Sequence, residues 1–471
     1  MKRLLRNFIG VLALLATAAS AHAGRPDYVF LFIGDGMGPG HVMAAQDYLR
    51  AVSGRQDTTL LMTGFPVASL CTTRSASSPV TDSAAAGTAL STGVKTLNGM
   101  LGMSPDTTAL RSIARDFQKL GYGIGIVTSV AADDATPGAF YANVPNRGMY
   151  YEIGRQAAAS GYEFIAGAGL RGFSDGNGNP TGLASDFARY NVGIARGLDE
   201  LRRLGDHNKV VLLSPDTIRN YRIGYAVEAR PGDMTLADMT RAGINHLTRV
   251  RPDQFFMMVE GGAIDHAGHA NDAGAVIRDV LDFDSALRLA YEVYLAHPDN
   301  TLIVVTADHE TGGMSLGNNA TGYWADTALL TSQKLSKDTF SDMCKTLTDP
   351  TWEEMQEILR RDFGFWESIS LTDDQTQRLR DMFEATYVTR TAHLLPALYN
   401  NYNPFAAKVF DILDEHSGIG WTSNRHTGNP VPVFAVGVGS ELFVPMSDNT
   451  DIPTKIMRAC QTNRDAPVLM R

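Results

Sequence analysis

Ten residues spread along this 471-residue chain carry carboxylate, imidazole or hydroxyl groups that could form one reactive site. They comprise five carboxylates, three histidines and two hydroxyls: Asp35, Ser83, Asp134, Thr136, Glu260, Asp265, His269, Asp308, His309 and His426. So much like charge cannot cluster inside a protein without cations. Hard oxygen ligands suit Mg²⁺, whereas mixed sets of histidine and carboxylate suit Zn²⁺. The residue types therefore predict a metal site.

Ser83 would bring a hydroxyl to the first turn of a helix that residues 80–89 predict. The segment reads Val-Thr-Asp-Ser, followed by small and mostly helix-compatible residues. Free N–H groups and the positive dipole end at a helix N-terminus favour an anion, so this serine is well placed to meet a phosphate-like group. The alternative is that Asp82 and Ser83 only cap the helix.

Four strand-like runs would deliver the acidic groups to one edge of a sheet. The runs and the carboxylates that follow them are 28–34 with Asp35, 123–130 with Asp134, 254–259 with Glu260, and 301–306 with Asp308. Their largely apolar composition and the alternation with helical patterns predict a doubly wound, mostly parallel α/β sheet flanked by helices. Ligands bind at the carboxyl edge of such sheets, although an aspartate there also serves as a helix cap. Asp265 and His269 would share one face of a helix, which suits two ligands of one ion.

The remaining segments predict the organisation of the chain. A helix is expected to open at Ser104-Pro105 and to continue to Leu120, and residues 165–208 are expected to form a surface excursion with turns. Capping boxes at Thr351 and Thr372 predict a helical insertion over residues 317–422. This insertion would divide an α/β core at 24–316 from its completion at 423–471. It could act as a lid or a dimer contact, or it could be a solvated surface embellishment.

The N-terminus and the composition indicate where the protein is located and which partners it is expected to have. Residues 1–23 have the basic, apolar and A-x-A-like regions of a cleavable signal peptide, which predicts a periplasmic or secreted protein. Its removal would lower the formal charge from −10 to −13, and an acidic chain without a basic run argues against nucleic acid as a partner. No later stretch is long enough to span a membrane. The three cysteines are scattered, allow at most one disulfide and lack metal-finger spacing.

Six blocks of the sequence resemble the alkaline phosphatase family. They occur in the family's order and are IGDGMG at 33–38, TDSAA at 81–85 with STGVKT at 91–96, DATP at 134–137, VEGGAID at 259–265, TADH at 306–309, and HTG at 426–428. The resemblance implies hydrolysis of small-molecule phosphate monoesters, with Ser83 as a nucleophile that forms a phosphoserine. It also implies that Arg147 clamps the phosphate and that Asp82 orients Arg147. A homodimer is what the family suggests.

The resemblance further implies three bound ions. The implied ligands are Asp35, Asp308 and His309 for a Zn²⁺ beside the Ser83 oxygen; Asp265, His269 and His426 for a second Zn²⁺; and Glu260, Thr136 and a shared Asp35 for Mg²⁺, with Asp134 ordering its surroundings. His266 stands where some members of the family carry lysine, and a histidine there could favour another ion in place of Mg²⁺.

Two other functions remain alternatives. One is a phosphodiesterase of the same superfamily, and the other is a non-catalytic relative that binds metal and keeps the fold. A sulfatase is disfavoured because the chain has serine without a Cys-x-Pro-x-Arg signature. Arg147 favours a dianionic monoester over a diester.

Overall fold

A ten-stranded sheet forms the centre of the computed structural model, which describes residues 25–216 and 221–460. In spatial order its strands are β16 (Ser447–Asp448), β2 (Val67–Thr72), β15 (Val431–Gly437), β8 (Thr301–Thr306), β1 (Tyr28–Ile33), β7 (Phe255–Glu260), β3 (Gly123–Thr128), β4 (Phe164–Gly167), β6 (Val210–Leu213) and β5 (Gly193–Arg196). β15 runs antiparallel to its neighbours β2 and β8, and the other neighbouring pairs are parallel. The predicted mostly parallel α/β sheet is confirmed. The predicted signal peptide lies outside the described residues.

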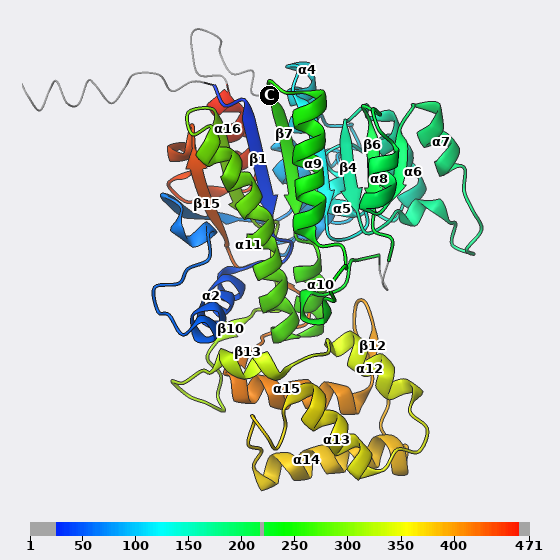
Figure 1. The fold of residues 1–471 in the computed structure, drawn as a ribbon, viewed down its shortest axis with the longest axis vertical. Coiled ribbons are helices and arrows are strands. Elements are labelled where there is room, and N and C mark those ends of the chain that lie inside the picture. The colour runs from blue at the N-terminus through cyan, green and yellow to red at the C-terminus, as the bar shows by residue number, and fades with distance from the viewer. Residues whose placement is uncertain (1–24, 217–220, 461–471) are drawn as a thin grey trace, which may run out of the picture.

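Helices cover both faces of the sheet because alternate side chains of its buried strands point to opposite sides. On β7, Phe256 stacks on Phe117 of α4 (Ile113–Lys119), with ring centroids 4.8 Å apart. The next residue, Met257, lies against Gly243 of α9 (Leu236–Val250), beside which α11 (Ala273–Ala296) packs (Figure 1). Other helices of the core are α2 (Pro39–Ser53), α3 (Ser83–Thr92), α5 (Ala135–Gly138), α6 (Tyr150–Ala159), α7 (Leu183–Arg189), α8 (Leu198–Arg203), α10 (Ala263–Ala270) and α16 (Asp451–Cys460).

The register of the central strands brings their carboxyl ends level. Ile33 at the end of β1 lies opposite Glu260 of β7 and Thr306 of β8, and Thr128 of β3 also lies opposite Glu260. The residues just beyond these ends are therefore neighbours in space although they are far apart in the sequence. This edge of the sheet positions the candidate site.

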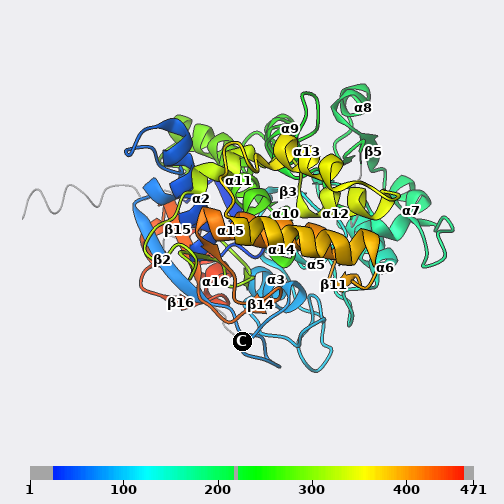
Figure 2. The ribbon, with the colours of Figure 1, turned by 90° about the horizontal axis from the view of Figure 1, so that it is seen from below.

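Four helices lie beyond this edge: α12 (Lys337–Thr346), α13 (Trp352–Phe363), α14 (Asp373–Phe383) and α15 (Pro404–Ser417) (Figure 2). The predicted capping boxes are confirmed, since Thr351 and Thr372 each accept a hydrogen bond from the third residue of the helix that follows. The segment leaves and rejoins the core at adjacent points, because β10 (Ser315–Leu316) pairs with β13 (Ile419–Gly420). The pair β9 (Glu310–Thr311) and β14 (His426–Thr427) lies next to this junction.

The prediction of a helix from Ser104 to Leu120 is wrong for its first half. Asp106 accepts hydrogen bonds from the Ser104 hydroxyl and the Thr108 N–H, and Thr107 adopts a φ of 68°. These side-chain bonds close a turn that competes with a helix. Ser112 then supplies the cap, and α4 runs only from Ile113 to Lys119.

The surface excursion predicted for residues 165–208 is confirmed only in part. Residues 174–180 form a turn closed by a bridge between Ser174 and Pro180. The flanking residues instead build β4 and β5, which extend the sheet on either side of β6. Both strands have four residues, and their glycine and alanine content hid the apolar pattern.

The described residues also bear on membrane spans and on disulfide bonds. Among residues 25–216 and 221–460, no helix combines the length and the apolarity needed to cross a membrane. The three cysteines, Cys71, Cys344 and Cys460, are buried free thiols.

Candidate active site

Ser83 begins α3, with Asp82 as its cap. One oxygen of Asp82, Oδ1, accepts the N–H of Ala85 at 3.0 Å, and the other, Oδ2, accepts a hydrogen bond from Arg147 Nη1 at 3.2 Å. Asp82 thus both caps the helix and holds the arginine. The Ser83 side chain is 5% exposed, and its Oγ lies 3.2 Å from His309 Nε2. The serine hydroxyl therefore sits at the positive end of a helix and faces an imidazole.

His309 Nε2 is surrounded by oxygen atoms from three different elements. Asp308 Oδ2 lies at 3.2 Å, Asp35 Oδ1 at 3.3 Å and Ser83 Oγ at 3.2 Å. Neither of these two carboxylate oxygens has a hydrogen-bond partner among the described residues, and both are buried. One nitrogen cannot satisfy three oxygens, whereas a cation among them can.

The hydrogen-bond partners of His309 determine which of its ring nitrogens carries the proton. Thr311 donates its hydroxyl proton to Asp265 Oδ1 at 2.5 Å, so its oxygen can only accept from His309 Nδ1, 3.3 Å away. Nε2 then carries a lone pair and points at the oxygen cluster. This is the tautomer of a metal ligand.

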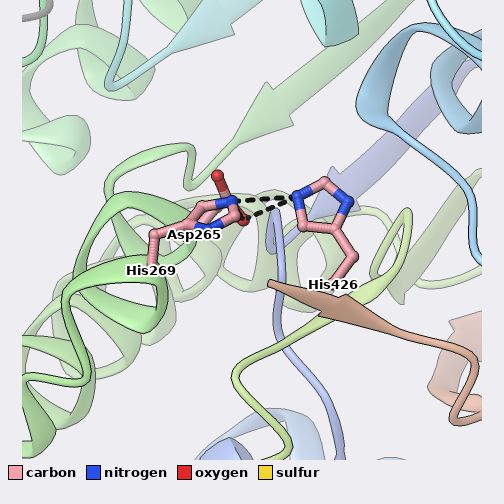
Figure 3. Close-up of side chains that lie close together, drawn as sticks. All are labelled: Asp265, His269 and His426. Carbon is pink, nitrogen blue, oxygen red and sulfur yellow. Dashed lines mark hydrogen bonds and ion pairs between the residues drawn. The ribbon is translucent and has the colours of Figure 1, made fainter. Parts of the chain in front are cut away.

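A second cluster consists of Asp265, His269 and His426, drawn in Figure 3. Nδ1 of His269 donates to the Asn424 carbonyl at 2.8 Å, and Nδ1 of His426 donates to the Thr81 carbonyl at 2.9 Å. Their Nε2 lone pairs therefore face one another at 3.0 Å, and Asp265 Oδ1 lies 3.4 and 3.5 Å from them. Two lone pairs and a carboxylate at these distances repel unless a cation lies between them.

The clusters are linked through Asp265 and Asp35. The carboxylate of Asp265 lies close enough to Asp35 and His309 to share an ion with them. It also lies close enough to His269 and His426, the two histidines of the second cluster, to share an ion with those. Asp35 Oδ2 accepts a hydrogen bond from Thr136 at 3.4 Å, on the side away from His309. Glu260, the last residue of β7, accepts a hydrogen bond from Thr128. Asp35 also lies close enough to Glu260 for the charge of Glu260 to raise the pKa of Asp35.

Asp134 faces arginines. Its Oδ1 accepts a hydrogen bond from Arg147 Nη2 at 3.1 Å, and its Oδ2 accepts one from Arg171 Nη2 at 3.0 Å. Burial alone would raise the pKa of Asp134, but Arg171 and Arg147 hold it below its usual value. Asp82 and Asp134 together fix the guanidinium of Arg147 beside Ser83.

Clustering without an ion shifts the pKa values of the buried carboxylates. Burial raises the pKa of Glu260 to about 8, and burial together with Asp265 raises the pKa of Asp308 to about 7. Burial and the charges of Asp308 and Asp265 hold the pKa of Asp35 well above its usual range. Burial opposes ionisation of Asp265 too, but the facing histidines hold its pKa below the usual value. Bound cations would relieve this repulsion.

These shifts predict that the metal-free chain loses stability as the pH rises from about 6.5 to about 8. The unfolded chain releases the protons of Glu260 and Asp308 near pH 4, whereas the folded chain keeps them to higher pH. The free energy of unfolding therefore falls by up to about 1.4 kcal/mol per pH unit for each proton retained. Burial also lowers the pKa of His309, but the resulting rise in stability ends near pH 6.5, where unfolded histidine titrates. Urea unfolding of the chelated chain measures the slope, and a rise across this window would contradict the prediction.

The structure brings the ten predicted residues to one edge of the sheet and adds two that the sequence analysis missed. Arg171 comes from the 165–208 region, and Tyr399 comes from the loop between β11 (Leu395–Pro396) and β12 (Asn401–Tyr402). Tyr399 donates a hydrogen bond to Asp265 Oδ2 at 3.3 Å, and its ring centroid lies 4.0 Å from that of His266. Both follow stretches without a recognisable motif, so no sequence signal marked them.

Comparisons with known proteins match the chain to one family. A family model described as alkaline phosphatase matches residues 27–167 and 219–462. Alkaline phosphatase 4 of Bacillus subtilis is 27% identical over 391 residues, which cover 82% of this chain and 77% of the relative. The crystal structure of a cold-active alkaline phosphatase from Shewanella sp. matches with a TM-score of 0.78 at 27% identity, covering 92% of this chain and 100% of that one. The Thermus thermophilus alkaline phosphatase matches with a TM-score of 0.76 at 28% identity, covering 95% and 94%.

Proposed function

This chain belongs to the alkaline phosphatase family and is a phosphomonoesterase, and we propose that it transfers the phosphoryl group of its substrate to Ser83 before water releases it. One observation carries the proposal: Ser83 Oγ lies 3.2 Å from His309 Nε2 at the N-terminus of α3, with Arg147 held beside it. A phosphoryl group placed there meets the positive end of a helix, a guanidinium and a nucleophilic oxygen.

We propose two Zn²⁺ and one Mg²⁺ as the ions of this site. The ligands would be Asp35, Asp308 and His309 for the Zn²⁺ beside Ser83; Asp265, His269 and His426 for the second Zn²⁺; and Asp35, Thr136 and Glu260 for Mg²⁺, with Asp134 and His266 nearby. The facing Nε2 lone pairs of His269 and His426 support nitrogen-binding ions at the second position. Bound ions would lower the pKa of a neighbouring hydroxyl or water and neutralise charge on the phosphoryl oxygens.

The side chains of the protein have separate tasks in this reaction. The Ser83 hydroxyl releases its proton to solvent as its oxygen attacks phosphorus. The bond between phosphorus and the alcohol oxygen of the substrate breaks, and that oxygen takes up a proton from solvent as the alcohol leaves. Arg147 donates to two non-bridging oxygens, which carry the spread charge of a loose transition state. Asp82 and Asp134 hold the guanidinium in the required plane. Water then displaces the serine oxygen from phosphorus, so two inversions give net retention.

A comparison of substrates tests the proposed class. The wild-type chain is expected to hydrolyse an aryl phosphate monoester with a higher kcat/KM than the matching diester. Arg147→Ala is expected to lower kcat/KM for the monoester by about 10²-fold, and the diester rate by less, because a diester carries one negative charge fewer for the guanidinium to stabilise.

Arg55→Ala serves as the control, because Arg55 pairs with Asp57 on the surface and should leave both rates unchanged. A strong preference of the wild type for the diester would favour the phosphodiesterase alternative. An unchanged kcat/KM for the monoester in Arg147→Ala would refute the phosphate-clamping role.

A further inference from the structure

Tyr399 reaches the ion site from the hairpin between β11 and β12. The hairpin joins β11 to β12 across residues 397–400, and its leucines point outward, with Leu395 46% and Leu398 49% exposed. Tyr399 alone among these three turns to the Asp265 carboxylate. The side chain of Tyr399 therefore contacts a residue of the candidate ion site.

We propose that Tyr399 is a positioning residue that fixes the Asp265 carboxylate for ion binding, an inference that rests on the proposed function. Tyr399 O–H donates to Oδ2 at 3.3 Å, whereas Thr311 donates to Oδ1 at 2.5 Å. The two hydroxyls hold the carboxylate from opposite oxygens. Oδ1 is then the oxygen presented to the Nε2 atoms of His269 and His426.

The ring of Tyr399 supports the same face of α10. Its centroid lies 4.0 Å from that of His266 in a tilted arrangement and 5.3 Å from that of His269 at an interplanar angle of 80°. These contacts limit the rotation of the His269 ring, whose Nδ1 is already tied to the Asn424 carbonyl. One tyrosine therefore restrains both a carboxylate and an imidazole of the same ion cluster.

A buried ion pair anchors the hairpin just after Tyr399. Asp338 of α12 accepts hydrogen bonds on Oδ1 from the Asn400 amide at 3.1 Å and the Tyr402 hydroxyl at 2.9 Å. Its Oδ2 lies 3.2 Å from Arg222 Nη2, and the Arg222 side chain is 1% exposed. The pair connects the helical segment to the core, so Tyr399 is held by elements from both. The 317–422 segment thereby contributes directly to the site.

Removal of the Tyr399 hydroxyl should weaken ion binding without unfolding the chain. Partners that orient metal ligands typically change metal affinity by about 10- to 100-fold when they are mutated. Tyr399→Phe keeps the ring and its contacts with the histidines but frees Oδ2 of Asp265. We expect the affinity for zinc at one of the two zinc sites to fall by about 10-fold.

The experiment is a competition titration of zinc against a chromophoric chelator, with the full-length metal-free chain. Tyr387→Phe is the matched control, because that hydroxyl donates to the Cys344 carbonyl at 3.0 Å and touches no ligand of the site. Thermal unfolding of each metal-free variant reports the fold. We expect both variants to unfold at the wild-type temperature and only Tyr399→Phe to bind zinc more weakly.

Three outcomes would overturn the inference in distinguishable ways. If wild type and Tyr399→Phe each bind two zinc ions with equal affinity, Tyr399 has no positioning role and the proposed function stands. If the wild type binds fewer than two zinc ions, the proposed ion site fails and the inference fails with it. A Tyr399→Phe chain with a lowered metal-free unfolding temperature would assign the residue to the fold instead.

Discussion

Replacement of Ser83 with alanine is expected to lower kcat for a phosphate monoester by about 10³-fold or more, because no other hydroxyl among the described residues contacts Nε2 of His309. The lost oxygen is the atom that would accept the phosphoryl group, so neither Arg147 nor the ion ligands can substitute for it. Zinc content should stay near the wild-type value, since Ser83 contributes one contact to a cluster that also has Asp35 and Asp308. Steady-state kinetics and elemental analysis of the same preparation measure both quantities.

Ser91→Ala is the control for this prediction. Ser91 lies in the same helix, is buried, and donates its hydroxyl to the Thr88 carbonyl at 3.3 Å. The same substitution there should leave turnover close to wild type. Acid-quenched wild-type enzyme should carry phosphate on the peptide containing Ser83. Full activity in Ser83→Ala would refute the nucleophile assignment, and loss of zinc together with activity would reassign the residue to ion binding.

Removal of the metal ions is expected to abolish turnover and to lower the unfolding temperature by several degrees. Without ions, the folded chain must hold four carboxylates and three histidines within one buried cluster. Each ion that binds only the folded chain at about 100 times its Kd stabilises it by about 2.7 kcal/mol. Dialysis against a chelator, followed by differential scanning calorimetry and a monoester assay, tests both effects.

Adding metal ions back distinguishes the effect of losing the ions from damage to the chain. Zinc added back should recover activity and the unfolding temperature, and magnesium alone should recover neither fully, because two of the three ligand groups contain histidine nitrogens. Two zinc ions and one magnesium ion per chain are the expected content. Full turnover in a chain depleted of all metal would exclude the proposed mechanism, and a depleted chain that unfolds at the wild-type temperature would exclude the stabilising role.

Local sequence patterns predicted much of the fold, because the strands and helix caps concerned depend on residues that are neighbours in the sequence. The apolar runs at 28–34, 254–259 and 301–306 became β1, β7 and β8, since strands buried on both faces carry few polar residues. The capping boxes at Thr351 and Thr372 were also correct, because a cap is formed within one turn. The helix expected from Ser104 failed for a related reason, as Asp106 closed a turn that periodicity does not reveal.

The sequence by itself determined which strand-end carboxylates meet at the edge of the sheet. Asp35, Glu260 and Asp308 directly follow or end buried parallel strands, so the register of the sheet sufficed to bring them level. Tertiary structure alone decided how these groups face one another. It placed Asp265 between two clusters, turned Asp134 toward Arg147 and Arg171, and brought Tyr399 onto Asp265 from the helical segment. Such contacts join residues more than 130 positions apart in the case of Tyr399 and Asp265, and packing between elements, which no local pattern encodes, fixes them.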